Sequence, residues 1–263
     1  MTRRFVLAAL VLLLPAPVSA LEEQIRTIPS RPDVTESFVL IHPSRPPVAS
    51  VVLFMGGRGA LGLQRGPLTP RNTNFLVRTR QRFAEKGFLV AVVDVPSDRT
   101  SQALVGFRTS AEHATDVRAL IATLHAAAPV PVWLVGTSMG SVSAANAAAR
   151  LSDGGPDGIV LTSSVMGRSR EMGESLQDVA LDRIRVPVLI VHHRDDTCPS
   201  SRYADTSWAM RRLSATPRKE LRAFSGGDAP QSAPCEPLAP HGYFGIEERV
   251  VDAIAAWITA AKP

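Results

Sequence analysis

The feature that most constrains the fold of this chain is a glycine-flanked turn near its middle. Gly136-Thr137-Ser138-Met139-Gly140 follows the apolar run 131–135 and leads into the small-residue stretch 139–150. The run predicts a buried strand, and the stretch after it predicts a helix. Side chains at Gly136 and Gly140 would clash with the neighbouring strand and helix. The sequence therefore predicts a tight strand–turn–helix unit with Ser138 at its tip.

Strands and helices alternate along the rest of the chain. Short apolar runs stopped by turn residues predict strands, whereas apolar residues spaced by three and four predict helices. The expected strands are 37–41, 48–55, 88–95, 131–135, 158–161, 186–192 and 220–224. The expected helices are 74–86, 110–127, 139–150, 200–213 and 245–260. This alternation predicts an α/β fold with a mostly parallel sheet and helices on both of its faces.

The length and composition suit one domain with a substantial core. Of the 263 residues 45% are hydrophobic and only 5% aromatic, which suits buried parallel strands beneath Ala-rich helices. Residues 21–34 are expected to be an irregular lead-in, because Pro29 and Pro32 interrupt regular structure. The segment 166–183 leaves little room for a separate cap domain. We therefore expect a single domain at residues 21–263.

Residues 1–20 are expected to be a secretory signal peptide and not part of the core. Arg3 and Arg4 precede an unbroken apolar run at 5–14, and Val18-Ser19-Ala20 offers small residues for cleavage. A membrane anchor is the alternative, but the run is shorter than the roughly 20 residues that a bilayer requires. The protein is thus expected in the periplasm or outside the cell after cleavage near Ala20, without stable membrane insertion.

The charge is only mildly basic, at +5 for the whole chain. Removing Arg3 and Arg4 leaves 27 basic residues against 24 acidic ones, or +3. A nucleic-acid surface needs more concentrated positive charge with aromatic residues between, so no nucleic acid is expected as a partner. A solvated helix face is the favoured interpretation of a loose basic cluster at Arg65, Arg71, Arg78, Arg80 and Arg82.

No motif for a metal or cofactor is found. Gly56-Gly57-Arg58-Gly59 lacks the spacing of a phosphate loop or a dinucleotide fingerprint. His192 and His193 are adjacent, so their side chains diverge if the strand continues, and neither joins a ligand spacing typical of zinc. No cofactor is therefore expected.

The strand–turn–helix unit around Ser138 resembles the nucleophile elbow of the α/β-hydrolase superfamily, in which Gly-x-Ser-x-Gly exposes a strained serine. The small size and the lack of a cap are most similar to compact dienelactone-hydrolase-like esterases. The resemblance covers about residues 35–260 and implies a fold with a catalytic triad in the chain order serine, acid, histidine. It assigns the nucleophile to Ser138.

The same resemblance implies an acid after the strand that follows the nucleophile helix. Asp196 matches a Gly-x-x-Asp turn in which His193 stands where glycine is usual, and Asp195 is the adjacent alternative. The base must come later, and His241 is the only histidine after Asp196. The acid would hold the imidazole in the correct tautomer. His42, His113 and His125 precede the nucleophile and are poor candidates.

An oxyanion hole completes such a site, with one N–H donor after the nucleophile and one in the loop after an earlier central strand. Met139 is the first donor. The second lies in a loop that resembles the His-Gly-Gly motif of esterases, with Met55 in place of the histidine; Gly57 matches best and Arg58 is the runner-up. Arg58 is also a candidate contact for a substrate carboxylate, although a solvated surface residue is slightly favoured.

The resemblance implies an exported serine hydrolase that cleaves a small-molecule carboxylic ester or lactone through an acyl-enzyme. The alternatives are a peptidase or amidase with the same triad, and a binding protein that kept the fold without catalysis. A structural envelope protein is less favoured, because no repeat or interaction tail is found.

Cys198 and Cys235 are the only cysteines in the chain. Cys198 lies just after Asp196 and Cys235 just before His241, so a triad that joins the acid and the base would bring both loops together. An oxidising compartment would allow the thiols to pair. We expect a disulfide between them, with two separate thiols as the alternative.

Overall fold

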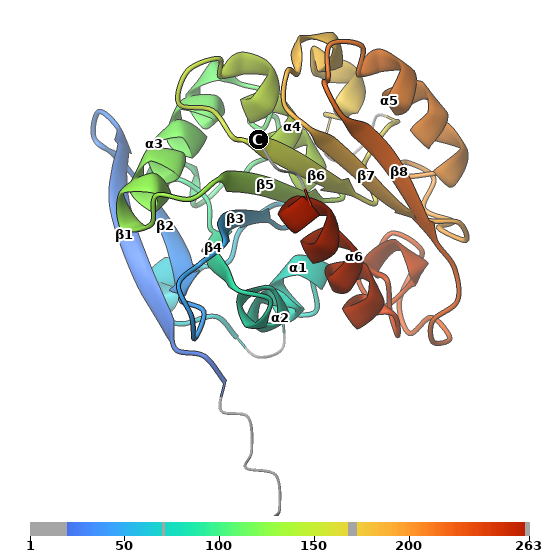
Figure 1. The fold of residues 1–263 in the computed structure, drawn as a ribbon, viewed down its shortest axis with the longest axis horizontal. Coiled ribbons are helices and arrows are strands. Elements are labelled where there is room, and N and C mark those ends of the chain that lie inside the picture. Colours follow the sequence, from blue (N-terminus) through green and yellow to red (C-terminus); the bar gives the residue numbers. More distant parts are fainter. Residues whose placement is uncertain (1–19, 70–71, 168–172, 261–263) are drawn as a thin grey trace, which may run out of the picture.

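Eight strands form one sheet in this computed structural model, which describes residues 20–69, 72–167 and 173–260. The strand order is β1-β2-β4-β3-β5-β6-β7-β8 (Figure 1). The strands are β1 Glu23–Arg31, β2 Val34–Ile41, β3 Ala49–Phe54, β4 Phe88–Val93, β5 Val132–Thr137, β6 Gly158–Thr162, β7 Val188–His193 and β8 Lys219–Phe224. The six strands β4, β3, β5, β6, β7 and β8 pair in parallel with one another. Strands β1 and β2 lie at one edge of the sheet, where β1 pairs with β2 and β2 with β4 in antiparallel orientation. The predicted mostly parallel sheet is confirmed.

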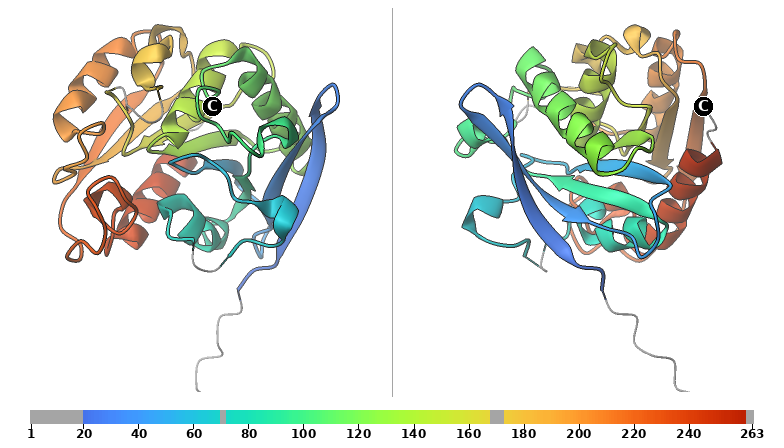
Figure 2. Two further views of the ribbon diagram at one scale, coloured as in Figure 1. Left: turned by 180° about the vertical axis from the view of Figure 1, so that it is seen from behind. Right: turned by 60° about the vertical axis from the view of Figure 1, so that its left-hand side comes forward.

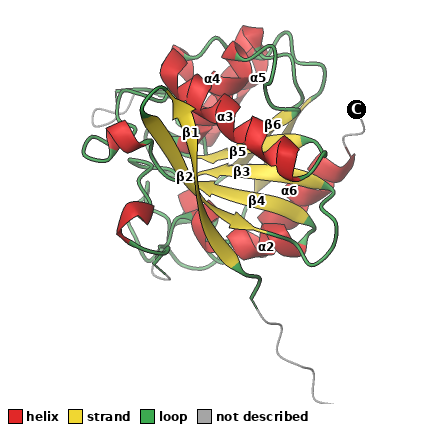
Figure 3. Cartoon of the chain, turned by 90° about the vertical axis from the view of Figure 1, so that its left-hand side faces the viewer, coloured by secondary structure: helices red, strands yellow, loops and turns green. Residues whose placement is uncertain are grey.

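Helices cover both faces of the sheet, as the views in Figures 2 and 3 show. One face packs against α3 Ala111–Ala127, α4 Gly140–Arg150 and α5 Thr206–Arg212. The other packs against α1 Phe75–Arg78, α2 Arg80–Glu85 and α6 Glu247–Ala260. This arrangement explains why the central strands read as continuous apolar runs, because a parallel sheet is buried on both sides.

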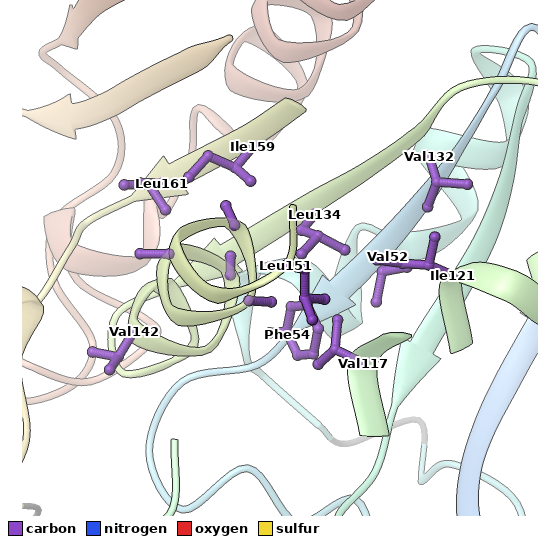
Figure 4. Close-up of a cluster of buried hydrophobic side chains, with 14 of the residues drawn as sticks. Val52, Phe54, Val117, Ile121, Val132, Leu134, Val142, Leu151, Ile159 and Leu161 are labelled. Carbon is purple, nitrogen blue, oxygen red and sulfur yellow. The ribbon is translucent and has the colours of Figure 1, made fainter. Parts of the chain in front are cut away.

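Successive side chains of each central strand enter different cores. Val52 and Leu134 contribute to the core beneath α3 and α4 (Figure 4), while Val51 and Val135 contribute to the core beneath α1, α2 and α6. The alternation follows from the two-residue period of a strand. Both cores converge on β3 and β5, whose carboxyl ends lead into the loop at 55–59 and into Ser138.

The expectation that residues 21–34 form an irregular lead-in is wrong, because most of that segment is the edge strand β1. Proline removes a backbone donor, which an edge strand tolerates on its open side. Pro29 pairs with Thr35 just before the register of β1 shifts. Ser30 and Arg31 also bind Asp116 of α3 at 2.6 and 2.8 Å, which fastens this edge to the helical layer.

The helix expected at 74–86 is interrupted at Thr79, which separates α1 from α2. Thr79 has φ −100° and ψ 3°, outside the helical range, and its hydroxyl donates to the Phe75 carbonyl at 2.7 Å. The predicted helix 200–213 is also shorter, because a 3₁₀ turn at Tyr203–Asp205 precedes α5. Within the described ranges, every helix is too short or too polar to cross a lipid bilayer.

Candidate active site

Ser138 occupies a strained turn between β5 and α4. Its φ of +52° lies in the left-handed region that side chains rarely adopt. A Cβ on Gly136 would overlap the Gly140 carbonyl, and one on Gly140 would overlap the Phe54 carbonyl. The Ser138 N–H donates to the Thr162 carbonyl at 2.9 Å, which holds the turn at the carboxyl edge of the sheet. The glycine requirement predicted from the sequence thus has a steric cause.

Asp196 and His241 are brought together from two separate loops. The Nδ1 atom of His241 lies 2.8 Å from Asp196 Oδ2. Both side chains are buried. Since an ionised carboxylate only accepts, Nδ1 carries the proton and Nε2 keeps its lone pair. Within the described chain Nε2 has no hydrogen-bond partner, so it is able to accept a proton.

The Asp196 carboxylate is held by two further donors. The Cys198 N–H donates to Asp196 Oδ1 at 2.9 Å, and the Ser201 hydroxyl donates to Oδ2 at 3.2 Å. Together with His241 they leave the carboxylate in one orientation. Asp195 points elsewhere: its side chain is 68% exposed and lies 3.8 Å from His193. Of the two candidate acids, the structure therefore brings Asp196 to His241.

His193 stands where the pattern of the resembled family has glycine. Its ring holds the turn that carries Asp195 and Asp196. Its Nδ1 accepts from the Asp195 N–H at 3.1 Å, so Nε2 carries the proton and donates to the Gly226 carbonyl at 2.8 Å. The ring thereby joins this turn to the segment after β8. His193 is not among the residues with positive φ, so the turn does not require glycine.

His192 is a supporting residue that sequence reasoning did not identify. Its buried ring donates from Nε2 to the Ser201 carbonyl at 2.9 Å, and Nε2 lies 3.6 Å from Asp196 Oδ2. Burial lowers the pKa of His192 below its ordinary value, which favours the neutral ring at pH 7. The only sequence signal for this role was the alternation of side chains along a strand, which predicts the direction of the His192 side chain but not its partners.

The turn that carries His241 is fastened from two sides. The Tyr243 hydroxyl donates to the Val191 carbonyl at 2.9 Å and accepts from the Ser163 N–H at 3.0 Å. Arg78 donates to the Gly242 carbonyl at 2.6 Å and pairs with Glu247 at 2.8 Å. The interpretation of the basic cluster as a solvated helix face is therefore wrong for Arg78.

The loop after β3 lies directly beside the serine. A Cβ on Gly56 would stand 2.9 Å from the Cβ of Ser138, so only glycine fits there without displacement. Gly57 has a φ of +58°, and a Cβ there would meet nothing within 4 Å. The loop thus presents backbone next to Ser138, while Met139 is the N-cap residue of α4.

A cavity of about 490 Å³ lies over these groups. Ser138, Met139 and His241 line it, together with Gly57 and Arg58. Its volume falls within the roughly 300–1,000 Å³ typical of small-molecule sites. Arg58 is exposed at its edge and donates to the Gln102 carbonyl at 3.2 Å.

The predicted cysteine pair also lines this cavity. Cys198 and Cys235 are bonded in the structure, with their Cα atoms 4.6 Å apart. The bond joins the acid loop to the loop that precedes His241. No group of three or more His, Cys, Asp or Glu side chains in the described part of the chain is arranged to bind a metal ion.

Comparison with solved structures identifies the fold. A dienelactone hydrolase from Anabaena variabilis ATCC 29413 matches with a TM-score of 0.60 and 16% identity, over 92% of this chain and 97% of that one. An α/β serine hydrolase without a lid from Xanthomonas campestris matches with 0.60 and 16%, over 94% and 100%. The Pyrococcus furiosus esterase Pf2001 matches with 0.64 and 12%, over 94% and 96%.

These likenesses show that the chain has the α/β-hydrolase fold, as the resemblance implied. No protein-family model and no curated protein sequence matches the chain. Its chemistry must therefore be argued from the site itself.

Proposed function

We propose that this protein is a serine hydrolase that cleaves a carboxylic ester or lactone, with Ser138 as nucleophile, His241 as base and Asp196 as the acid that orients it. One observation carries the proposal: His241 Nδ1 donates a hydrogen bond to Asp196 at 2.8 Å, and His241 lines the same cavity as the strained Ser138. The tautomer imposed by Asp196 leaves Nε2 as the acceptor that a serine nucleophile requires.

The reaction follows from these roles. Ser138 Oγ attacks the carbonyl carbon while Nε2 of His241 takes its proton, and Asp196 stabilises the imidazolium. The N–H groups of Met139 and of Gly57, or of Arg58 as the alternative, stabilise the oxyanion. The imidazolium then protonates the leaving alcohol. Water, deprotonated by His241, attacks the acyl group and releases the acid and free Ser138.

An ester-type substrate is favoured over a peptide. The dienelactone hydrolase and the esterase match nearly the full length of both chains. The cavity also has the size of a small-molecule site. The Arg58 guanidinium lies at the rim of the cavity, where it would bind a carboxylate group of the substrate. A peptidase or amidase remains the alternative on the same triad.

A fluorophosphonate probe tests the proposal, because its phosphorus is attacked only by an activated serine. We expect stoichiometric labelling of Ser138 with loss of fluoride, and none in Ser138→Ala. His241→Ala should label at least about 10³-fold more slowly, because the general base is absent. Peptide mapping by mass spectrometry locates the label. A folded wild-type protein that does not label would instead support the non-catalytic binding protein.

We also propose that residues 1–20 are removed on export and that residues 21–263 form one domain. The sequence pattern supports export, although residues 1–19 lie outside those that the structure describes. The disulfide is a second argument, because such bonds persist in oxidising compartments. N-terminal sequencing of protein from the periplasm or the medium should begin at Leu21. Protein recovered there with Met1 intact would contradict cleavage.

A further inference from the structure

We propose that Arg108 is a positioning residue that orients the backbone donors of the oxyanion hole, an inference that rests on the proposed function. Arg108 belongs to the turn segment before α3 and is 1% exposed. A buried guanidinium is costly unless its donors are satisfied. Its partners lie beside the serine, and the triad makes no use of it.

The guanidinium binds the loop after β3 by two carbonyl oxygens. Arg108 Nη2 donates to the Met55 carbonyl at 3.3 Å and to the Gly57 carbonyl at 3.1 Å. In a trans peptide the C=O and the next N–H point in opposite directions, and the described chain contains no cis bond. Fixing these carbonyls therefore also fixes the N–H groups of Gly56 and Arg58.

The peptide group between Gly56 and Gly57 is also held in one orientation. The Gly56 carbonyl accepts from the Gly59 N–H at 3.3 Å, which sets the direction of the Gly57 N–H. The loop's three successive carbonyls thus all have defined partners, two of them on Arg108. Glycine allows peptide groups to rotate at little cost, so Gly56 and Gly57 would leave the donors free to turn away without these contacts.

Arg108 also connects this loop to the nucleophile helix. Its Nη1 donates to the Ser143 hydroxyl at 2.7 Å, one turn into α4 from Met139. The same guanidinium therefore fixes both halves of the oxyanion hole relative to each other. Preorganised donors of this kind are what stabilise a developing oxyanion, since they need no rearrangement during the reaction.

Arg108 keeps its charge although it is buried. Burial lowers the pKa of Arg108 to about 10, with Glu174 opposing that shift, so the guanidinium carries its proton at neutral pH. Glu174 accepts from the Thr109 N–H at 2.9 Å, which places its carboxylate beside the Arg108 backbone.

The test compares Arg108→Met and Arg108→Lys with Arg150→Met as a matched control. Arg150 holds the same segment through the Thr109 carbonyl, at 3.0 Å, without touching the loop. A lysine keeps the charge but cannot span Ser143 and both carbonyls. We expect kcat for p-nitrophenyl acetate to fall about 10²–10³-fold in Arg108→Met, as for loss of one oxyanion donor, and by a smaller factor in Arg108→Lys. Arg150→Met should stay within about twofold of wild type.

A second readout separates orientation from general damage. Binding of a phenyl trifluoromethyl ketone, which forms an oxyanion on Ser138, should weaken in proportion to kcat/KM while KM changes less than about threefold. If Arg108→Met does not fold, Arg108→Lys carries the same comparison. Near wild-type kcat in a folded Arg108 variant would overturn the proposal, as would a rise in KM that accounts for the whole loss. A wild-type protein without Ser138-dependent activity would refute the proposed function instead.

Discussion

Asp196→Asn is expected to lower kcat for p-nitrophenyl acetate by about 10⁴-fold, whereas Asp195→Asn should leave it within about twofold. Asparagine is nearly isosteric, but it is neutral and cannot stabilise the imidazolium, and its amide favours the wrong tautomer of His241. The Asp195 carboxylate lies 3.8 Å from His193 instead, and its side chain is 68% exposed. Steady-state kinetics on the two purified variants measure the difference.

The local structure makes this pair a strict comparison. Both variants remove one negative charge from the same turn, so a general electrostatic effect would appear in both. The Cys198 N–H can still donate to the carboxamide oxygen at position 196, which preserves part of the turn. KM should change little, because the acid does not touch the substrate. Equal losses in the two variants, or a larger loss in Asp195→Asn, would refute the role of Asp196.

The strands that position the site were predictable because they are buried on both faces. Residues such as Val51, Val90 and Val135 have no exposed surface, and their strands read as continuous apolar runs. Strand β1 was missed for the opposite reason. It lies at the edge, much of it is exposed, and it contains Pro29, so its sequence lacks the signal of a buried strand.

The break between α1 and α2 could not be predicted for a different reason. Neither glycine nor proline marks it, and the hydroxyl bond from Thr79 to the Phe75 carbonyl is no signal either, because Thr115 and Thr123 make the same bond inside the uninterrupted helix α3. The second of the two helices, α2, packs against β4 and α6, and such tertiary contacts are not encoded in the local sequence.

The candidate triad was accessible from chain order, but its supports were not. Ser138 is marked by its flanking glycines, and His241 is the only histidine after the acid. Arg108, by contrast, reaches carbonyl groups more than 50 positions earlier in the chain. Backbone carbonyls carry no sequence signature, so a residue that binds them is recognised only after the fold has brought the segments together.

Removing the disulfide with Cys235→Ala is expected to lower the free energy of unfolding by about 3–4 kcal/mol. The bond closes a loop with a sequence separation of 37, and the chain-entropy model gives this magnitude for such a loop. Cys235 is the better cysteine to replace, because it is exposed whereas Cys198 is 3% exposed. The alanine therefore leaves no cavity in the core, and the backbone N–H of Cys198 remains available to Asp196.

Urea unfolding of four samples isolates the contribution of the bond itself. Wild type and Cys235→Ala are each measured with and without dithiothreitol, and the slope of the free energy against urea is compared. Dithiothreitol should lower the midpoint of wild type to that of the variant and leave the variant unchanged. The segment 225–239 before His241 has no helix or strand of its own, so it is held by the disulfide together with individual hydrogen bonds such as the one from His193 to the Gly226 carbonyl. Two free thiols in denatured, unreduced wild-type protein would rule out the bond, and an equal effect of dithiothreitol on both proteins would show that the shift has another origin.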